Sequence, residues 1–248
     1  MNNLNSCLSE FGFTEKHNTS LLVDPSIDSL LFIPYLMFPS NGNKTIIVSF
    51  REEVAKLKYL LKRRGIDLEK DKSVKIISGI DYLESSLHEQ HPVTESTIRT
   101  YHKGSRIRKS DKSKEIDTSL CLLIKHLKSQ IKPNTHLIID GIESIMYQSP
   151  NYSPVHVLAF LLNIENAFSA NRILYTISVQ GQLAKEQKVV LNFLKSKANI
   201  LLEVEKYKDS YSSEISGFLI ARSTQPGELE ETMFRMKFKA QIDGLVFS

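Results

Sequence analysis

Residues 136–141 read His-Leu-Ile-Ile-Asp-Gly and constrain the fold of this chain more than any other stretch. Three consecutive aliphatic residues suit a strand that is buried on both faces, as in a parallel sheet covered by helices. The run ends on Asp140, so we expect this carboxylate at the C-terminal edge of the sheet. Nucleotide-hydrolysing α/β domains bind ligands at that edge, where an acid can hold magnesium through water.

Strand and helix signals alternate along most of the chain. We predict strands at 20–23, 44–50, 74–77, 136–140, 172–179 and 199–204, and helices at 26–38, 52–64, 116–131, 155–168 and 188–197, with a helical turn at 82–87. Pro34 predicts that the helix at 26–38 is kinked or ends early. Strands separated by helices of this length require right-handed parallel crossovers. Three further strands follow without helices at 216–222, 233–239 and 244–247, and we expect them to be antiparallel.

These elements predict an α/β fold of three layers, with a mostly parallel central sheet between helices and antiparallel strands at its C-terminal end. The 248 residues, 41% of them hydrophobic, suffice for a single domain over 1–248. The longest apolar run, 30–38, is far shorter than the roughly 20 residues of a membrane span. Two cysteines and a start without a secretory signal fit a reducing compartment. We therefore expect a cytoplasmic or nuclear protein with no membrane partner.

The positive charge of the chain is concentrated in one stretch. Seven bases and one acid, Asp111, lie between 99 and 114, a local charge of +6 in a chain whose net charge is +4, so the remainder is about −2. We predict a mobile basic loop at about 88–115. Its candidate nucleic-acid contacts are Arg99, Lys103, Arg106, Arg108, Lys109, Lys112 and Lys114. The alternative is a solvated insertion without a ligand, because charge alone specifies no partner.

The sequence lacks a phosphate-binding loop. Such a loop needs Gly-x4-Gly-Lys-Ser/Thr between the first strand and its helix, so that backbone amides and a lysine surround the phosphates. The available connection, 23–29, has no glycine, no lysine and two acids, and would repel a triphosphate. The string Gly-Asn-Lys-Thr at 42–45 is wrongly spaced and precedes a strand.

Two acids are candidates for a degenerate nucleotide site. Asp140 could hold a magnesium-bound water, and Glu52 follows the second strand, where some hexameric ATPases hold the base that orients the attacking water. Both also have structural explanations, as a strand-end hydrogen-bond acceptor and as an acid in the first turn of a helix. The histidines do not cluster with the cysteines, and no Gly-x-Ser-x-Gly motif is present. We predict no catalytic residues, no metal site, no cofactor and no enzymatic activity.

The order of elements and several strings resemble a RecA/KaiC-type core. These strings are Leu-Leu-Val-Asp at 21–24, Ile-Ile-Val-Ser-Phe at 46–50, Leu-Ile-Ile-Asp at 137–140 and Ile-Leu-Tyr-Thr at 173–176. The first turn without a phosphate loop, Leu60-x4-Gly65-Ile66-x-Leu68 and Ser223-x2-Pro226 are similar to the family of the sixth subunit of the Elongator complex. The similarity extends from about Leu21 to the C-terminus and is dispersed.

The resemblance implies a ring-forming subunit. Members of this family assemble with two paralogous RecA-like subunits, the fourth and fifth of Elongator. Their ring binds transfer RNA and docks on the catalytic subcomplex, which supports modification of wobble uridines. Two alternatives share the fold and the missing phosphate loop. One is a recombinase-paralog accessory protein in DNA repair, and the other is a weak ATPase whose sites lie between ring subunits.

Overall fold

The structure is a computed structural model. It describes residues 8, 19–24, 31–37, 44–51, 53–63, 65–88, 112–148, 152–179, 184–206, 216–223, 233–241 and 244–247. At 84–88, 112–118, 148, 240, 241 and 244 it describes the backbone only.

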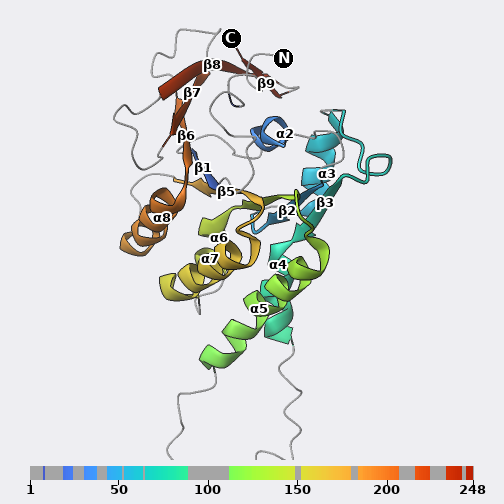
Figure 1. The fold of residues 1–248 in the computed structure, drawn as a ribbon, viewed down its shortest axis with the longest axis vertical. Helices are drawn as coiled ribbons and strands as arrows, with labels where there is room; N and C mark the ends of the chain where they lie inside the picture. Colours follow the sequence, from blue (N-terminus) through green and yellow to red (C-terminus); the bar gives the residue numbers. More distant parts are fainter. Residues whose placement is uncertain are drawn as a thin grey trace, which may run out of the picture.

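Nine strands form one sheet in the order β3-β2-β4-β5-β1-β6-β7-β8-β9 (Figure 1). They are β1 Thr19–Asp24, β2 Thr45–Ser49, β3 Val74–Ser78, β4 His136–Asp140, β5 Arg172–Ser178, β6 Ile200–Lys206, β7 Gly217–Ser223, β8 Met233–Gln241 and β9 Gly244–Phe247. All pairings from β3 to β6 are parallel, and those from β6 to β9 are antiparallel. The predicted fold class, a mostly parallel sheet with antiparallel C-terminal strands, is confirmed.

Helices cover both faces of the sheet and create two cores. The helices are α2 Ile33–Leu36, α3 Val54–Arg63, α4 Gly79–His88, α5 Lys112–Gln130, α6 Ile142–Gln148, α7 Pro154–Phe168 and α8 Lys185–Lys197. Side chains of α4 to α8 pack in the first core, and those of α2 and α3 pack in the second. Successive side chains of β4 pack in alternate cores: Leu137 and Ile139 pack in the first core and Ile138 packs in the second.

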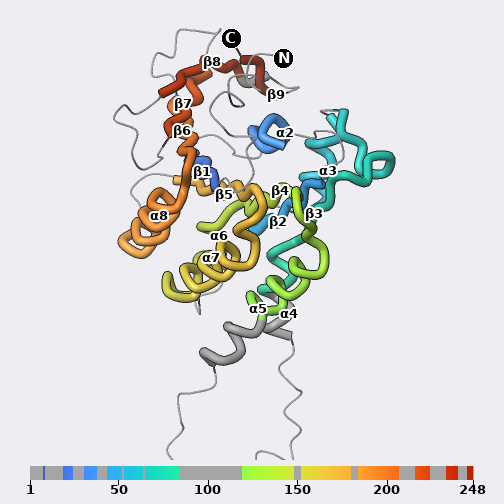
Figure 2. Tube along the Cα trace, viewed as in Figure 1, coloured from blue at the N-terminus to red at the C-terminus, as the bar shows by residue number. Residues whose placement is uncertain are grey.

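The first described helix and the last strand lie together (Figure 2). The Tyr35 hydroxyl of α2 donates to the Leu245 carbonyl at 2.5 Å and accepts from the Leu245 N–H at 2.8 Å. The Phe247 ring packs edge-on against Tyr35, with the ring centroids 5.2 Å apart. These contacts connect the antiparallel strands to the N-terminal part of the domain.

Several predicted boundaries need correction. The helix expected at 26–38 is, in its described part, one turn from Ile33 to Leu36, and Pro34 lies in its first turn, where a missing N–H costs no hydrogen bond. The turn expected at 82–87 is the ten-residue helix α4. The helix α6 after β4 was not predicted.

The predicted basic loop lies almost entirely outside the described residues, and so do five of its seven candidate contacts, Arg99, Lys103, Arg106, Arg108 and Lys109. Helix α5 begins at Lys112 and not at 116, so the backbone of Lys112 and Lys114 is helical and these two positions do not belong to a loop. Within the described part of the chain, no helix has the length and apolar character needed to span a membrane.

Candidate functional site

Four strands of the parallel sheet end at one edge, at Asp24 of β1, Ser49 of β2, Asp140 of β4 and Ser178 of β5. The register pairs Ser49 with Asp140 and Asp24 with Ser178. Every residue of β4 is buried, so the prediction of a doubly buried strand that ends on Asp140 is confirmed. In open α/β sheets, ligands bind beside this edge.

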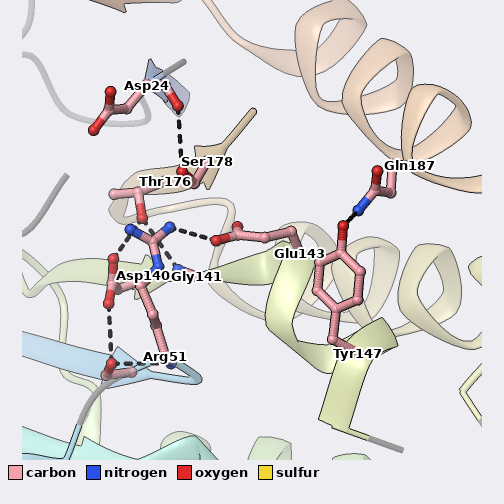
Figure 3. Close-up of polar contacts among 10 residues, drawn as sticks. Asp24, Arg51, Asp140, Gly141, Glu143, Tyr147, Thr176, Ser178 and Gln187 are labelled. Atoms are coloured by element: carbon pink, nitrogen blue, oxygen red, sulfur yellow. Dashed lines mark hydrogen bonds and ion pairs between the residues drawn. The ribbon is translucent and has the colours of Figure 1, made fainter. Parts of the chain in front are cut away.

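The Asp140 side chain is bound on both sides by hydroxyl groups of the neighbouring strands. Its Oδ2 accepts from Ser49 Oγ at 2.9 Å, and its Oδ1 accepts from Thr176 Oγ1 at 2.6 Å (Figure 3). The backbone carbonyl of the same residue accepts from the Phe50 N–H at 2.9 Å. Asp140 is 0% exposed. A carboxylate in this setting acts as a charge-assisted acceptor that holds three strands in register.

The turn after β4 requires glycine. Gly141 has a φ of +76°, and a Cβ placed there would lie 2.7 Å from Arg51 Cβ. Its N–H donates to Thr176 Oγ1 at 3.1 Å, so one hydroxyl contacts both the carboxylate and the turn. This turn leads directly into α6 and positions Glu143 on the first turn of that helix.

A half-buried cation, Arg51, lies beside the strand ends. The Arg51 guanidinium is 2.5 Å from Glu143 Oε1, and the two side chains are only 16% and 8% exposed. Figure 3 shows this guanidinium directed toward the space between Glu143 and Asp140. Burial raises the pKa of Glu143, and the charge of Arg51 opposes that shift. The arginine therefore compensates negative charge that the fold has removed from water.

A second polar contact connects α6 to α8. Gln187 Nε2 donates to the Tyr147 hydroxyl, and Gln187 Oε1 accepts from the Ala184 N–H at 3.0 Å (Figure 3). The glutamine thus binds the start of its own helix and reaches across to α6. It contributes to packing between the two helices beside the strand edge.

Of the two acids that the sequence offered as a degenerate nucleotide site, the structure describes only one. Asp140 is at the strand edge, whereas Glu52 lies outside the described residues. Its neighbour Glu53 precedes α3, and its carbonyl accepts from the N–H groups of Lys56 and Leu57. Among the residues that the structure describes, no group of three or more His, Cys, Asp or Glu could hold a metal ion.

The sequence patterns did not identify four partners at this site, Ser49, Arg51, Glu143 and Thr176. Arg51 and Glu143 are 92 residues apart, and Thr176 lies 36 residues after Asp140. Local signals were weak, although Ser49 and Thr176 lie near the ends of predicted strands and Arg51 and Glu143 follow the ends of others. The sequence did predict parallel strands, whose C-terminal ends lie at one edge of a sheet, and residues near those ends were therefore candidates.

Neither a protein-family model nor a curated protein sequence matches the chain. Solved structures do match. A KaiC-like protein from Pyrococcus horikoshii has a TM-score of 0.57 and 16% identity over 94% of this chain and 90% of that chain. Flagellar accessory protein FlaH from Methanocaldococcus jannaschii has a TM-score of 0.55 and 11% identity over 94% and 90%. The fold is RecA/KaiC-like.

A third matching structure is that of an uncharacterized Pyrococcus horikoshii protein in complex with an unknown peptide. It has a TM-score of 0.57 and 13% identity over 98% of this chain and 96% of that chain. Identities this low show the shared fold alone. The function has to be argued from the residues at the strand edge and on the surface, because one fold supports many activities.

Proposed function

We propose that this chain is a non-catalytic RecA-like subunit of a hetero-oligomeric ring in the Elongator complex. Its partners are the paralogous fourth and fifth subunits, the catalytic subcomplex and transfer RNA, and its role is to support wobble-uridine modification in the cytoplasm and nucleus. The RecA/KaiC-like fold and the sequence resemblance to the sixth-subunit family support this assignment.

The non-catalytic part of the proposal rests on the Asp140 carboxylate, which is buried and hydrogen-bonded through both oxygens. A magnesium-nucleotide site needs an acid that reaches a metal-bound water. Here each carboxylate oxygen accepts from a neighbouring hydroxyl and the residue is 0% exposed. Beside it, Arg51 and Glu143 form an ion pair with each other. These charged groups therefore support a structural role for this edge of the sheet.

The strand that would precede a phosphate loop supports the same interpretation. β1 ends on Asp24, which is 0% exposed, and the sequence that follows contains no glycine or lysine before residue 30. A phosphate cradle depends on backbone amides and a cation, so a carboxylate at this position opposes triphosphate binding. Loss of nucleotide chemistry leaves assembly and RNA binding as the functions of the subunit.

Co-purification tests the proposal. The tagged full-length chain, expressed in its native cell, is expected to recover the fourth and fifth Elongator subunits and transfer RNA, as measured by mass spectrometry and RNA sequencing. Recovery of recombination proteins in their place would overturn the Elongator assignment. The assembled ring is then assayed for ATP binding and hydrolysis with this subunit in its natural form and as Asp140→Asn or Glu52→Gln. Equal values support a non-catalytic subunit, and a loss in either variant would establish the ATPase alternative.

A further inference from the structure

The antiparallel end of the sheet has one covered face and one outward face. Leu219 of β7 and Met236 and Phe238 of β8 belong to the second core. No buried side chain of β7, β8 or β9 belongs to the core under α4 to α8. Over β7 to β9 the face opposite the second core is therefore not packed by those helices, although Ile220, the cross-strand neighbour of Arg235 on that face, is only 4% exposed.

A row of cations follows the outward face of β8. It consists of Arg235, Lys237 and Lys239, which we call the cation row. Because successive side chains alternate between faces, these three point the same way and stand about 6.8 Å apart. Lys237 is exposed, and the Arg235 side chain is 49% exposed. Lys239 is half-buried, and among the described residues no carboxylate forms an ion pair with Lys237 or Lys239.

The first member of the cation row has a fixed position. Arg235 Cζ lies 3.8 Å from the centroid of the Phe218 ring on β7, and its Nη2 lies 3.3 Å from Glu205 Oε2 on β6. The Phe218 ring makes a cation–π contact with the guanidinium, and the Glu205 carboxylate forms an ion pair with it. These two contacts hold the Arg235 side chain in position. An arginine held in this way can stack on a nucleic-acid base, because its planar group is already oriented.

The surrounding face is positive. Glu203 already pairs with two cations, Lys195 at 3.1 Å and Arg222 at 3.5 Å. With the cation row and Arg222, the described residues of this face of β6 to β8 have four cations against two carboxylates, Glu203 and Glu205, and Lys195 of α8 brings the local net charge from +2 to +3. Lysines on an exposed strand also discourage pairing of sheet edges. That role does not require a guanidinium stacked on an aromatic ring at the end of the row.

We propose that the outward face of β6 to β8 binds a single-stranded segment of RNA. Lys237 and Lys239 contact successive phosphates, and a base stacks on Arg235. Regularly spaced cations beside a stacking platform are the combination by which proteins bind single-stranded nucleic acid without a sequence code. The inference rests on the proposed function, for which it names a transfer-RNA contact in addition to the predicted basic loop.

The test compares charge-matched variants of the full chain. Binding of an unmodified transfer-RNA transcript and of an oligouridylate is measured by fluorescence anisotropy from low to high salt. Lys237→Ala/Lys239→Ala is expected to weaken both by roughly tenfold near 0.1 M salt and to reduce the salt slope on the oligouridylate by about 1.4, or 0.7 for each lost phosphate contact. Lys58→Ala/Lys62→Ala removes two exposed cations from α3 and is expected to leave binding unchanged.

A second variant tests the stacking platform. Arg235→Lys keeps the charge and loses the planar group, so oligouridylate binding is expected to fall about fivefold with an unchanged salt slope. Circular dichroism and thermal unfolding confirm that each variant is folded. Equal effects of the β8 and α3 double variants would overturn the proposal.

Assembly is scored separately by co-purification of the paralogs. A β8 double variant that loses paralogs but keeps RNA affinity would make this face a protein interface and would also overturn the RNA proposal. If the paralogs never co-purify with the natural chain, the Elongator assignment fails. The RNA measurement on the chain alone still decides the inference.

Discussion

The strand edge at Asp140 and the outward face of β8 both concentrate charge, but they do so in opposite ways. At the edge, each carboxylate oxygen of Asp140 accepts from a hydroxyl, and Arg51 lies against Glu143 with little exposure. On β8, Lys237 is exposed and forms no ion pair among the described residues. Asp140 and Arg51 have partners within the fold, although Glu143 Oε2 accepts no hydrogen bond among the described residues, whereas Lys237 remains available to a partner.

This difference predicts different effects of substitution at the two places. Removing charge from water is costly, so a buried charged group persists where hydrogen bonds or opposite charge compensate it. Substitutions at the edge should therefore reduce stability, and substitutions on β8 should reduce binding at almost unchanged stability. Three measurements, taken from the largest expected effect to the smallest, test this contrast.

Asp140→Ala is expected to lower the free energy of unfolding by about 3 kcal/mol, because two hydroxyls lose a charged acceptor in a buried site. Urea denaturation of the purified natural chain and variant measures this difference in the free energy of unfolding. Asp140→Asn keeps the volume and one acceptor, so its loss is expected to be smaller. Glu69→Ala removes an exposed acid and is expected to cost less than about 0.5 kcal/mol. A loss below 1 kcal/mol in Asp140→Ala, together with lost ATP binding by the ring, would contradict the structural role.

Acid should destabilise the parallel half through His136. This residue is 2% exposed at the start of β4, and burial, together with the charge of Arg172 on β5, lowers its pKa from 6.5 to about 3. Between these values the unfolded chain binds a proton that the folded chain does not. The free energy of unfolding therefore falls as the pH drops through this window, by about 2 kcal/mol at pH 5.

Paired denaturation curves at pH 7 and pH 5 test this dependence. His136→Gln is expected to lose that part of the acid sensitivity, whatever its stability at pH 7. His126→Gln, a substitution at a half-buried position on α5, should keep it. The same pH response in the natural chain and in His136→Gln would exclude His136 as the cause.

The smallest effect is expected on the outward face. Glu205→Gln removes the carboxylate 3.3 Å from Arg235, in a pair whose side chains are about half exposed. Exposed pairs of this kind contribute little, so the free energy of unfolding should change by less than about 0.5 kcal/mol. RNA affinity should change little, since the gain in positive charge opposes the loss of the carboxylate that holds Arg235 in position. A large loss of stability would show that this face, like the edge, depends on its charges for folding.

Much of the fold follows from local sequence patterns. Short aliphatic runs with polar ends predicted the buried parallel strands, and amphipathic segments predicted α3, α5, α7 and α8. The helix at Pro34 was predicted with the wrong bounds, and the short helix α6 was not predicted. In both cases a proline or a glycine that local rules associate with the end of a helix lies at or just before its beginning.

The sequence by itself determined an α/β sheet with antiparallel strands at its end and no phosphate cradle, because strand burial and glycine-rich loops leave local signatures. Only the tertiary structure decided the state of Asp140. Its partners come from positions 91 residues before it and 36 residues after it, and the strand order brings them to one edge. The cation row is local in sequence, but its support by Phe218 and Glu205 depends on the register of β6, β7 and β8. A carboxylate or an arginine acquires its role from what surrounds it, and in this protein those surroundings come from distant parts of the chain.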